Sequence, residues 1–443
     1  MIKRFHTPLL IVFLLGTSLS AQQDWIRTGT GLGVEKVRLA VPLFQPTPGT
    51  GEANALLTEF NDTLWRDLEN AGIFEMVSKS FYPLSVPAAP QQVKVEAWSN
   101  PPPNASMVVF GNLGVFGEDA VMQGWLYDVK NPASPLVLGK QYREKATQEQ
   151  ARVMAHRFAN EIILRLGGGL PGVAESKIFF ISNRSGTKEV WMMDYDGAGQ
   201  KQVSHLGSVA LSPRVSPDGS RVAFTSYARG SADLVVFSLE LGRLVNFPRF
   251  AGTNASPAWS PDGARLAFSS SMRGDPEIFV ADASGANPKR LTAFRGPDIS
   301  PAWNPKTGTQ MAFVSGRSGL PQIYIMAADG TNVQRMTDTG YAVSPSWSPN
   351  GQFLAFSWMR SYGPGAPGGQ DIYIMDIASQ RWVQLTHDGG RNDFPSWSPD
   401  GRQIVFQSSR GGSQQIWAML ADGSQPRQLT RSGSNTQPNW SFR

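Results

Sequence analysis

The chain has 443 residues, of which 41% are apolar, 10% aromatic and 17% charged, with a formal charge of +5. This length exceeds one ordinary core and indicates about two or three domains. The chain contains no cysteine, so disulfides and thiolate metal sites are excluded, and we expect no lipid-bearing cysteine anchor. It has no dense Lys/Arg run, which gives nucleic-acid binding little support.

The first residues predict an export signal. Lys3 and Arg4 precede an apolar run over residues 8–15, and small residues follow up to Ala21. The apolar run is far shorter than the roughly 20 residues that span a bilayer. We therefore expect residues 1–21 to be a signal peptide, cleaved after Ser20 or Ala21, and the mature chain to be a freely soluble monomer outside the cytoplasm.

Residues 35–168 show no repeat and predict a small α/β domain. A helix with its apolar residues on one face runs from Leu56 to Leu68, and a second helix begins at the capping-box residue Thr147. Residues 22–34 precede this domain, and residues 169–176 form the linker after it. Strands are expected at 36–44, 106–112, 120–129 and 136–142.

A repeated motif fills the remainder of the chain, and its copy at Ser256–Phe268 reads SPAWSPDGARLAF. Its tryptophan recurs about every 44 residues, a period typical of four-stranded propeller blades. A Gly/Pro insertion at 361–370 accounts for one longer interval. The repeated tryptophans are Trp259, Trp303, Trp347, Trp397 and Trp440.

The repeat also predicts how the ring closes. There are six copies of the second strand of a blade, but the first copy, at Lys177, has no inner strand before it. The chain ends with an inner strand around Trp440 that has nothing after it. We therefore predict that these two strands pair and close a six-bladed β-propeller over residues 177–443, which removes both free sheet edges.

Features that occur in every blade are interpreted as scaffold. Asp-Gly and Asn-Gly dipeptides supply the positive φ angles of the hairpin turn, and the tryptophans fill the wedge between blades. One arginine follows each second strand, and we favour a role in fixing the turn over attraction of an acidic partner. These arginines are Arg184, Arg229, Arg273, Arg317, Arg360 and Arg410.

The loops that enter the inner strands differ between blades, so binding is expected there. They are rich in polar and aromatic residues, a composition that suits a protein or peptide partner but is also common in ordinary loops. Their candidate contact residues are Thr253, Asn254, Ser256, Asp298, Ser300, Tyr341, Asn392, Asp393, Asn435 and Gln437.

Signals for catalysis are weak. The four histidines, His6, His156, His205 and His387, have no metal-ligand spacing, and a GxSxG pentad is absent. The carboxylates of Asp194 and Asp196 could suggest calcium, but a hairpin turn explains them better. The sequence therefore predicts no enzyme and no cofactor.

The order of export signal, α/β domain, Gly/Pro linker and six WSPDG-type blades resembles the TolB family of the periplasmic Tol-Pal system. The segments KVRLAVPLF, LENAGIFEMVSKS and MVVFGNL resemble that family's N-terminal domain. The resemblance implies a scaffold that binds the lipoprotein Pal over the propeller mouth, and Thr253, Asn254 and Ser256 are the nearest matches to the Pal-contacting loop. It also implies that TolA binds residues 22–34, which include Asp24, Trp25, Ile26 and Arg27.

In such a system the protein couples the envelope layers and maintains the outer membrane during division. The N-terminal segment is glycine-rich and could add a strand to a partner's sheet, although a frayed terminus would look the same. Two other functions stay open: a propeller hydrolase or lyase working in the channel, and a glycan-binding propeller.

Overall fold

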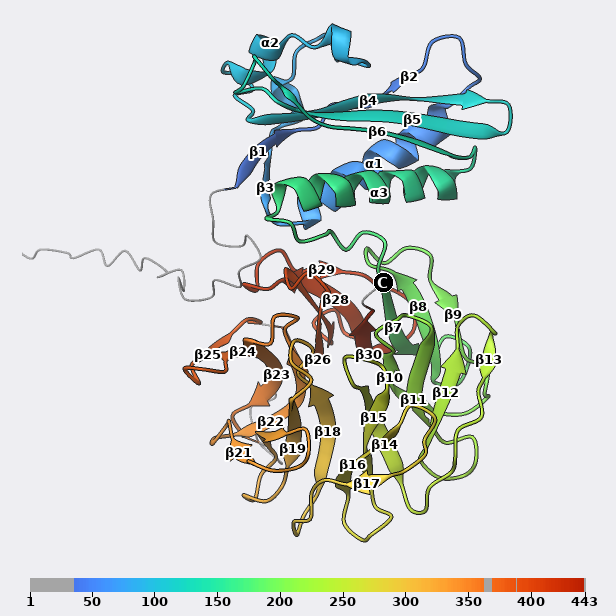
Figure 1. The fold of residues 1–443 in the computed structure, drawn as a ribbon, viewed down its shortest axis with the longest axis vertical. Coiled ribbons are helices and arrows are strands. Elements are labelled where there is room, and N and C mark those ends of the chain that lie inside the picture. The colour runs from blue at the N-terminus through green and yellow to red at the C-terminus, as the bar shows by residue number, and fades with distance from the viewer. Residues whose placement is uncertain (1–35, 362–368, 388, 442–443) are drawn as a thin grey trace, which may run out of the picture.

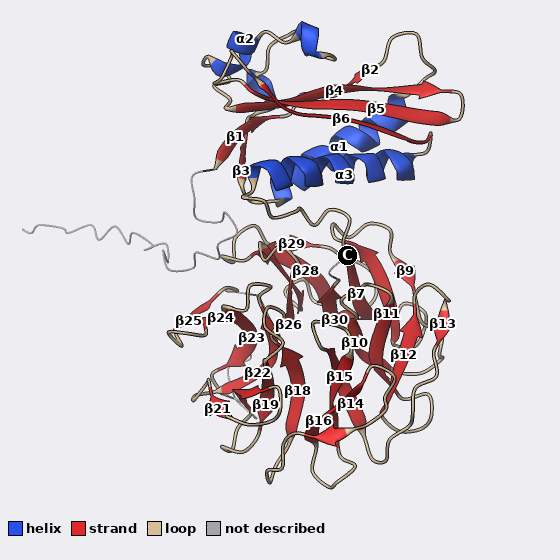
Figure 2. Ribbon diagram, in the orientation of Figure 1, coloured by secondary structure: helices blue, strands red, loops and turns tan. Residues whose placement is uncertain are grey.

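The computed structural model describes residues 36–361, 369–387 and 389–441. The predicted signal peptide, the predicted partner-binding segment 22–34 with Asp24 to Arg27, and most of the 361–370 insertion lie outside the described residues. The described chain forms two stacked units, an α/β unit and a ring of β-sheets (Figures 1 and 2).

The α/β unit contains a mixed sheet in the order β3-β1-β4-β5-β6, with β2 paired to β4. Two long helices, α1 and α3, lie together on one face of the sheet (Figure 1), and Thr147 Oγ1 accepts the amide of Gln150 as the predicted cap of α3. The elements are β1 Val37–Ala40, β2 Gln45–Pro46, α1 Asn54–Asn70, β3 Phe74–Met76, η1 Lys79–Phe81, η2 Pro90–Gln92, α2 Val95–Ser99, β4 Met107–Phe116, β5 Asp119–Asp128, β6 Leu136–Lys145 and α3 Gln148–Leu166.

The core of this unit lies between the sheet and the two helices. Phe60 and Leu64 of α1 and Phe158 of α3 are fully buried there, each contributing roughly 2 kcal/mol by the area it removes from water. A Cβ at Gly124 would lie 2.7 Å from the Phe158 ring, so only glycine allows this close approach of helix and strand. The predicted strand at 36–44 was too long, because the pairing of β1 ends at Ala40.

The remainder of the described chain forms six four-stranded antiparallel sheets, as the repeat predicted. Five sheets are continuous in sequence. They are β10 Ala210–Val215, β11 Arg221–Ser226, β12 Asp233–Ser238 and β13 Arg243–Leu244; β14 Asn254–Trp259, β15 Arg265–Ser270, β16 Glu277–Asp282 and β17 Lys289–Arg290; β18 Asp298–Trp303, β19 Gln310–Ser315, β20 Gln322–Ala327 and β21 Gln334–Arg335; β22 Tyr341–Trp347, β23 Phe353–Met359, β24 Asp371–Asp376 and β25 Trp382–Gln384; β26 Asn392–Trp397, β27 Gln403–Ser408, β28 Gln415–Leu420 and β29 Arg427–Gln428.

The sixth sheet joins the two ends of the repeat region and is here called the closing blade. It consists of β30 Asn435–Trp440, β7 Lys177–Ser182, β8 Glu189–Asp194 and β9 Lys201–Gln202. Trp440 lies opposite Ile178 in the antiparallel pair β30–β7, and the Trp440 indole N–H donates to Ser176 Oγ at 2.7 Å. The pairing of the C-terminal strand with the Lys177 strand is therefore present, and the ring has no free edge at this point.

The repeated turn and tryptophan have structural roles. Gly263 has a φ of 68°, whereas Asp262 fixes the turn with its side chain by accepting the Ser260 hydroxyl at 2.5 Å and the Ala264 amide at 3.0 Å. The Trp259 indole is buried and donates to Arg214 O of the preceding blade at 3.0 Å. Trp347 and Trp397 make the same bond to the preceding blade, so these three tryptophans join neighbouring blades.

Strand direction divides the ring into two ends. Each inner strand starts at one end, here called the mouth end, where the hairpins between second and third strands also lie. The Asp-Gly turns and the hairpins between third and outer strands lie at the opposite end, called the turn end. The α/β unit contacts the turn end, because Arg152 of α3 binds Asp196 in the β8–β9 hairpin. The mouth end therefore faces away from the α/β unit.

Candidate functional site: the propeller mouth and the junction with the α/β unit

The inner strands surround a channel with a volume of about 310 Å3. Each inner strand has an irregular register near its start, where one residue adopts a φ between 52° and 56°. The side chains of these residues form one ring in the channel lining, here called the bulge ring. Its members are Ser212, Ser256, Ser300, Ser344, Phe394 and Gln437.

Three predicted contact residues, Ser256, Ser300 and Gln437, belong to this ring. The Ser256 amide donates to Thr225 Oγ1 and the Ser300 amide to Ser269 Oγ, each at 3.1 Å, so the preceding blade holds both backbones. Within the described residues neither serine hydroxyl has a protein partner. Both hydroxyls are therefore available to a group that enters the channel.

Four other predicted residues do not face outward in this structure. Asn254, Asp298, Asn392 and Asn435 are fully buried at the first position of an inner strand. Asn254 and Asp298 bond within their own blades: Asn254 Oδ1 accepts the Ser270 hydroxyl at 2.6 Å, and Asp298 pairs with Arg317 at 2.8 Å. Asn392 and Asn435 bond to the preceding blade, where their Nδ2 atoms donate to Asp371 Oδ1 at 3.0 Å and to Gln415 Oε1 at 2.8 Å.

The remaining predicted mouth residues differ in exposure. Thr253 is exposed, and its hydroxyl lies 3.0 Å from that of Ser271. Tyr341 and Asp393 are half-buried, and Asp393 accepts the hydroxyls of Ser344 and Ser357 at 2.8 and 2.7 Å. Thr253 is therefore the predicted residue that is most open to a docked partner.

Three of the repeated arginines fix the mouth-end hairpins. Arg184, Arg317 and Arg410 each donate from Nε to the serine that ends the second strand, at 3.0, 2.8 and 3.0 Å. Their guanidinium groups stack on third-strand aromatic rings, with the carbon of Arg184 4.2 Å from the Trp191 ring centroid. Burial lowers the pKa of Arg184 and that of Arg410. These contacts support the scaffold interpretation for the three arginines.

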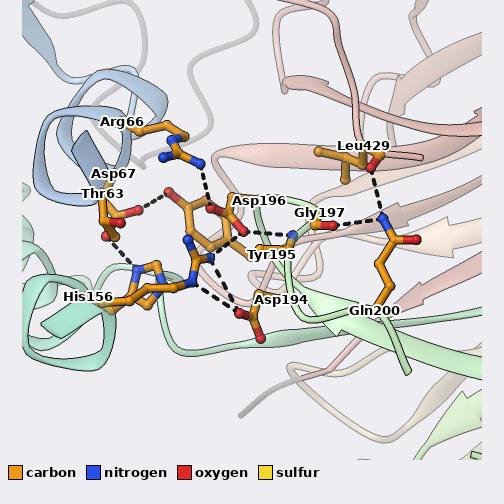
Figure 3. Close-up of polar contacts among 12 residues, drawn as sticks. Thr63, Arg66, Asp67, His156, Asp194, Tyr195, Asp196, Gly197, Gln200 and Leu429 are labelled. Atoms are coloured by element: carbon orange, nitrogen blue, oxygen red, sulfur yellow. Dashed lines mark hydrogen bonds and ion pairs between the residues drawn. The ribbon is translucent and has the colours of Figure 1, made fainter. Parts of the chain in front are cut away.

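The junction at the turn end is centred on a buried cluster that the sequence did not predict (Figure 3). Asp67 of α1 accepts the Tyr195 hydroxyl at 2.5 Å and lies 2.6 Å from Nδ1 of His156 in α3. The three residues are at most 5% exposed. Burial raises the pKa of Tyr195 well above its usual range, and the neighbouring Asp67 raises it further, so the phenol stays a hydrogen-bond donor.

Ion pairs surround this cluster (Figure 3). Arg152 of α3 lies 2.6 Å from Asp196 and 3.4 Å from Asp194, and Arg66 of α1 lies 3.2 Å from Asp196. Burial raises the pKa of Asp196, but the hydrogen bond and charge of Arg152 outweigh it, and the pKa lies below its usual range. The turn interpretation of Asp194 and Asp196 was incomplete, because their carboxylates also hold the two units together.

Groups of side chains that could bind a metal or catalyse a reaction are rare in the part of the chain that the structure describes. No group of three or more His, Asp or Glu side chains there could hold a metal ion, and no helix there has the length and apolar content of a membrane span. The described channel lining contains one charged residue, Arg214, and no histidine or carboxylate. The paired acids or acid and base of a hydrolase are thus not found in that lining.

Comparisons with known proteins identify the family. A family model described as the TolB beta propeller domain matches residues 166–363 and 339–443. The chain belongs to the TolB family. It is 35% identical over 246 residues to the Tol-Pal system protein TolB of Desulfosudis oleivorans, an alignment that covers 55% of this chain and 54% of that protein. It is also 35% identical over 216 residues to the Protein TolB homolog of Chlorobium chlorochromatii, covering 48% and 46%.

A solved TolB structure extends the likeness in fold. The crystal structure of TolB from Acinetobacter baumannii superposes with a TM-score of 0.77 at 24% identity and covers 93% of this chain and 98% of that one. The two-unit architecture is therefore that of TolB. The chain spans about half the length of the curated TolB-family relatives it matches.

Proposed function

We propose that this TolB-family chain is a non-enzymatic adaptor of a periplasmic Tol-Pal system. It binds a Pal-like lipoprotein at the mouth end and a TolA-like inner-membrane protein through residues 22–34, and so maintains the outer membrane during cell constriction. The names of the curated relatives support the system, and the acid-free channel lining supports an adaptor over an enzyme.

The observation that carries this proposal is the surface of the mouth end. Its loops carry exposed apolar side chains and its inner strands carry the polar bulge ring, a mixture that suits docking of a folded protein. The mouth end is also free of the α/β unit, which occupies the turn end. The exposed apolar residues there are Val209, Tyr227, Phe294 and Leu320.

Titration calorimetry with the Pal-like lipoprotein of the same organism, lacking its lipid, tests the mouth. Thr253→Glu and Phe294→Ala should each weaken binding at least tenfold, because interface contacts of this kind contribute about 1.4 kcal/mol or more. Thr309→Glu is the matched control, because Thr309 is exposed at the turn end and should leave binding unchanged. Equal affinities for Thr253→Glu, Phe294→Ala and the control would refute the mouth as the binding site.

A truncation tests the second partner. Removal of residues 22–34 should abolish binding of a TolA-like periplasmic domain and leave binding of the Pal-like protein intact. Loss of both interactions with an unchanged circular dichroism spectrum would contradict separate binding surfaces. If peptidoglycan fragments bind the intact chain and the lipoprotein does not, the glycan-binding alternative replaces the adaptor.

A further inference from the structure

A second ring of side chains lies in the channel, one step further from the mouth than the bulge ring. It holds one residue from each inner strand, placed by equivalent pairing with the second strand or, in the closing blade, with β7. Five positions are small or neutral, and the sixth is an arginine. The members are Arg214, Ala258, Ala302, Ser346, Ser396 and Asn439, and all line the channel.

Arg214 has no counter-ion among the described residues. Its Nη1 donates to the carbonyl oxygen of Pro213 at 2.8 Å, and the channel lining contains no carboxylate. Burial lowers the pKa of Arg214 to about 10, because the charged guanidinium is poorly solvated in the channel wall. Arg214 is half-buried in the channel wall, and a partly desolvated charge without a partner favours an anion that reaches it.

The bulge ring supplies further hydrogen-bond donors near Arg214. Ser212 is two residues away on the same inner strand, and the hydroxyls of Ser212, Ser256 and Ser300 have no protein partner within the described residues. Gln437 Oε1 accepts the Ser212 amide at 2.7 Å, which leaves its Nε2 as a donor. Every charged or polar group of this set can donate, and none carries negative charge. The set would repel a cation and stabilise an anion.

We propose that the channel binds an oxyanion, a carboxylate or phosphate group, on the guanidinium of Arg214 with the hydroxyls of Ser212, Ser256 and Ser300 as additional donors. The planar guanidinium offers two parallel N–H groups that match the oxygens of either group. A volume of about 310 Å3 holds such a group together with several water molecules, each of about 30 Å3. The proposal is independent of which protein occupies the mouth.

The test is titration calorimetry of the full mature chain with three probes: sodium acetate, inorganic phosphate and N-acetyl-aspartate amide. Acetate and phosphate distinguish the two oxyanions, and the aspartate derivative represents a carboxylate presented by a peptide. We expect saturable binding of at least one probe. Its affinity should fall at least tenfold in Arg214→Gln and by a smaller factor in Arg214→Lys, which keeps the positive charge but loses the two parallel N–H groups. Arg243→Gln removes one exposed arginine of the outer strand β13 and should bind as the wild type does.

Two results would overturn the proposal. One is the absence of saturable binding of all three probes to the wild type, and the other is equal affinity in Arg214→Gln and Arg243→Gln. If Arg214→Gln fails to fold, Arg214→Lys is compared with Arg243→Gln instead. A site that needs the two parallel N–H groups of the guanidinium must bind the probe more weakly in Arg214→Lys and with unchanged affinity in Arg243→Gln.

Discussion

The Tyr195 hydroxyl is the most direct probe of how the α/β unit is held on the propeller. Tyr195→Phe keeps the ring, which is 1% exposed, and removes a 2.5 Å hydrogen bond to Asp67. The acceptor is a buried carboxyl group, and hydrogen bonds to charged groups contribute about 1.5 to 3 kcal/mol. His156 still contacts the other oxygen of Asp67, so we expect a loss of about 2 kcal/mol, or roughly thirtyfold in the folding equilibrium.

Urea unfolding, followed in parallel by tryptophan fluorescence and circular dichroism, measures this loss and shows whether the two units unfold together. Tyr324→Phe is the control, since Tyr324 is buried in β20 and its hydroxyl has no protein partner within the described residues. In an Asp67→Asn background the Tyr195→Phe loss should shrink, because the acceptor charge is gone. A Tyr195→Phe loss no larger than the Tyr324→Phe loss would refute the role assigned to this bond.

Three further variants test the closure, the channel and the junction. Trp440→Ala should lower the free energy of unfolding of the propeller by about 3 to 5 kcal/mol, measured by thermal unfolding, because it leaves a cavity at a buried site and removes the hydrogen bond to Ser176. Leu241→Ala, at an exposed residue, is the control. An equally small loss in both variants would contradict the role of Trp440 in closing the ring. Arg214→Gln should raise stability by about 1 to 3 kcal/mol in anion-free buffer, since it removes a poorly solvated charge. Because the folded pKa of Arg214 is depressed to about 10, this gain is fully present below about pH 10 and declines as the pH rises from there to the higher pKa of the unfolded chain; a gain that grows with pH in urea titrations would be inconsistent with it. Asp196→Asn should cost about 1 to 2 kcal/mol at neutral pH. Because the folded pKa of Asp196 is lowered, the difference from wild type should be complete above about pH 4 and be lost as the pH falls further, through the folded pKa; a pH-independent difference in urea midpoints would exclude the ion-pair explanation.

The propeller could be predicted from the sequence because the motif that defines a blade is repeated several times. Each copy of the SPAWSPDG motif carries a turn, an inter-blade tryptophan and a strand pair, and these local signals agree with one another. The unmatched strands at Lys177 and Trp440 then leave one arrangement that satisfies every sheet edge, and the structure has that pairing. The short strands β2 and β3 carry no such repetition, and tertiary pairing alone defines them.

The mouth residues could be predicted only in part, because composition does not reveal the direction of a side chain. Asn254, Asp298, Asn392 and Asn435 are polar residues in variable loops, but they occupy the same position in four blades. The repetition that identified the tryptophans as scaffold applies equally to these residues. Their burial follows from the hydrogen bonds that each strand start needs.

Residues that depart from the blade repeat indicated the special contacts of this fold better than loop composition did. Tyr195 stands in a hairpin where three other blades have Ala283, Ala328 and Ala421, and it is the residue that reaches into the α/β unit. Its partner Asp67 is 128 residues away, so no local pattern could pair the two. Arg214 departs from its ring of small residues in the same way.

The closing blade both completes the ring and contacts the α/β unit. The closing blade bonds to the linker through Trp440 and Ser176 and carries Asp194, Tyr195 and Asp196 at or beside the end of β8. The neighbouring blade adds the fully buried Arg402, which donates to Gly167 O at 2.8 Å, where a Cβ on the glycine would lie 2.6 Å from the guanidinium. These hydrogen bonds and ion pairs of the α/β unit fall on two blades, whereas the channel uses the inner strands of all six. Strand β30 lines the channel and is bonded to the linker, so it connects the mouth to the α/β unit, and Trp440→Ala should loosen the junction as well as the ring.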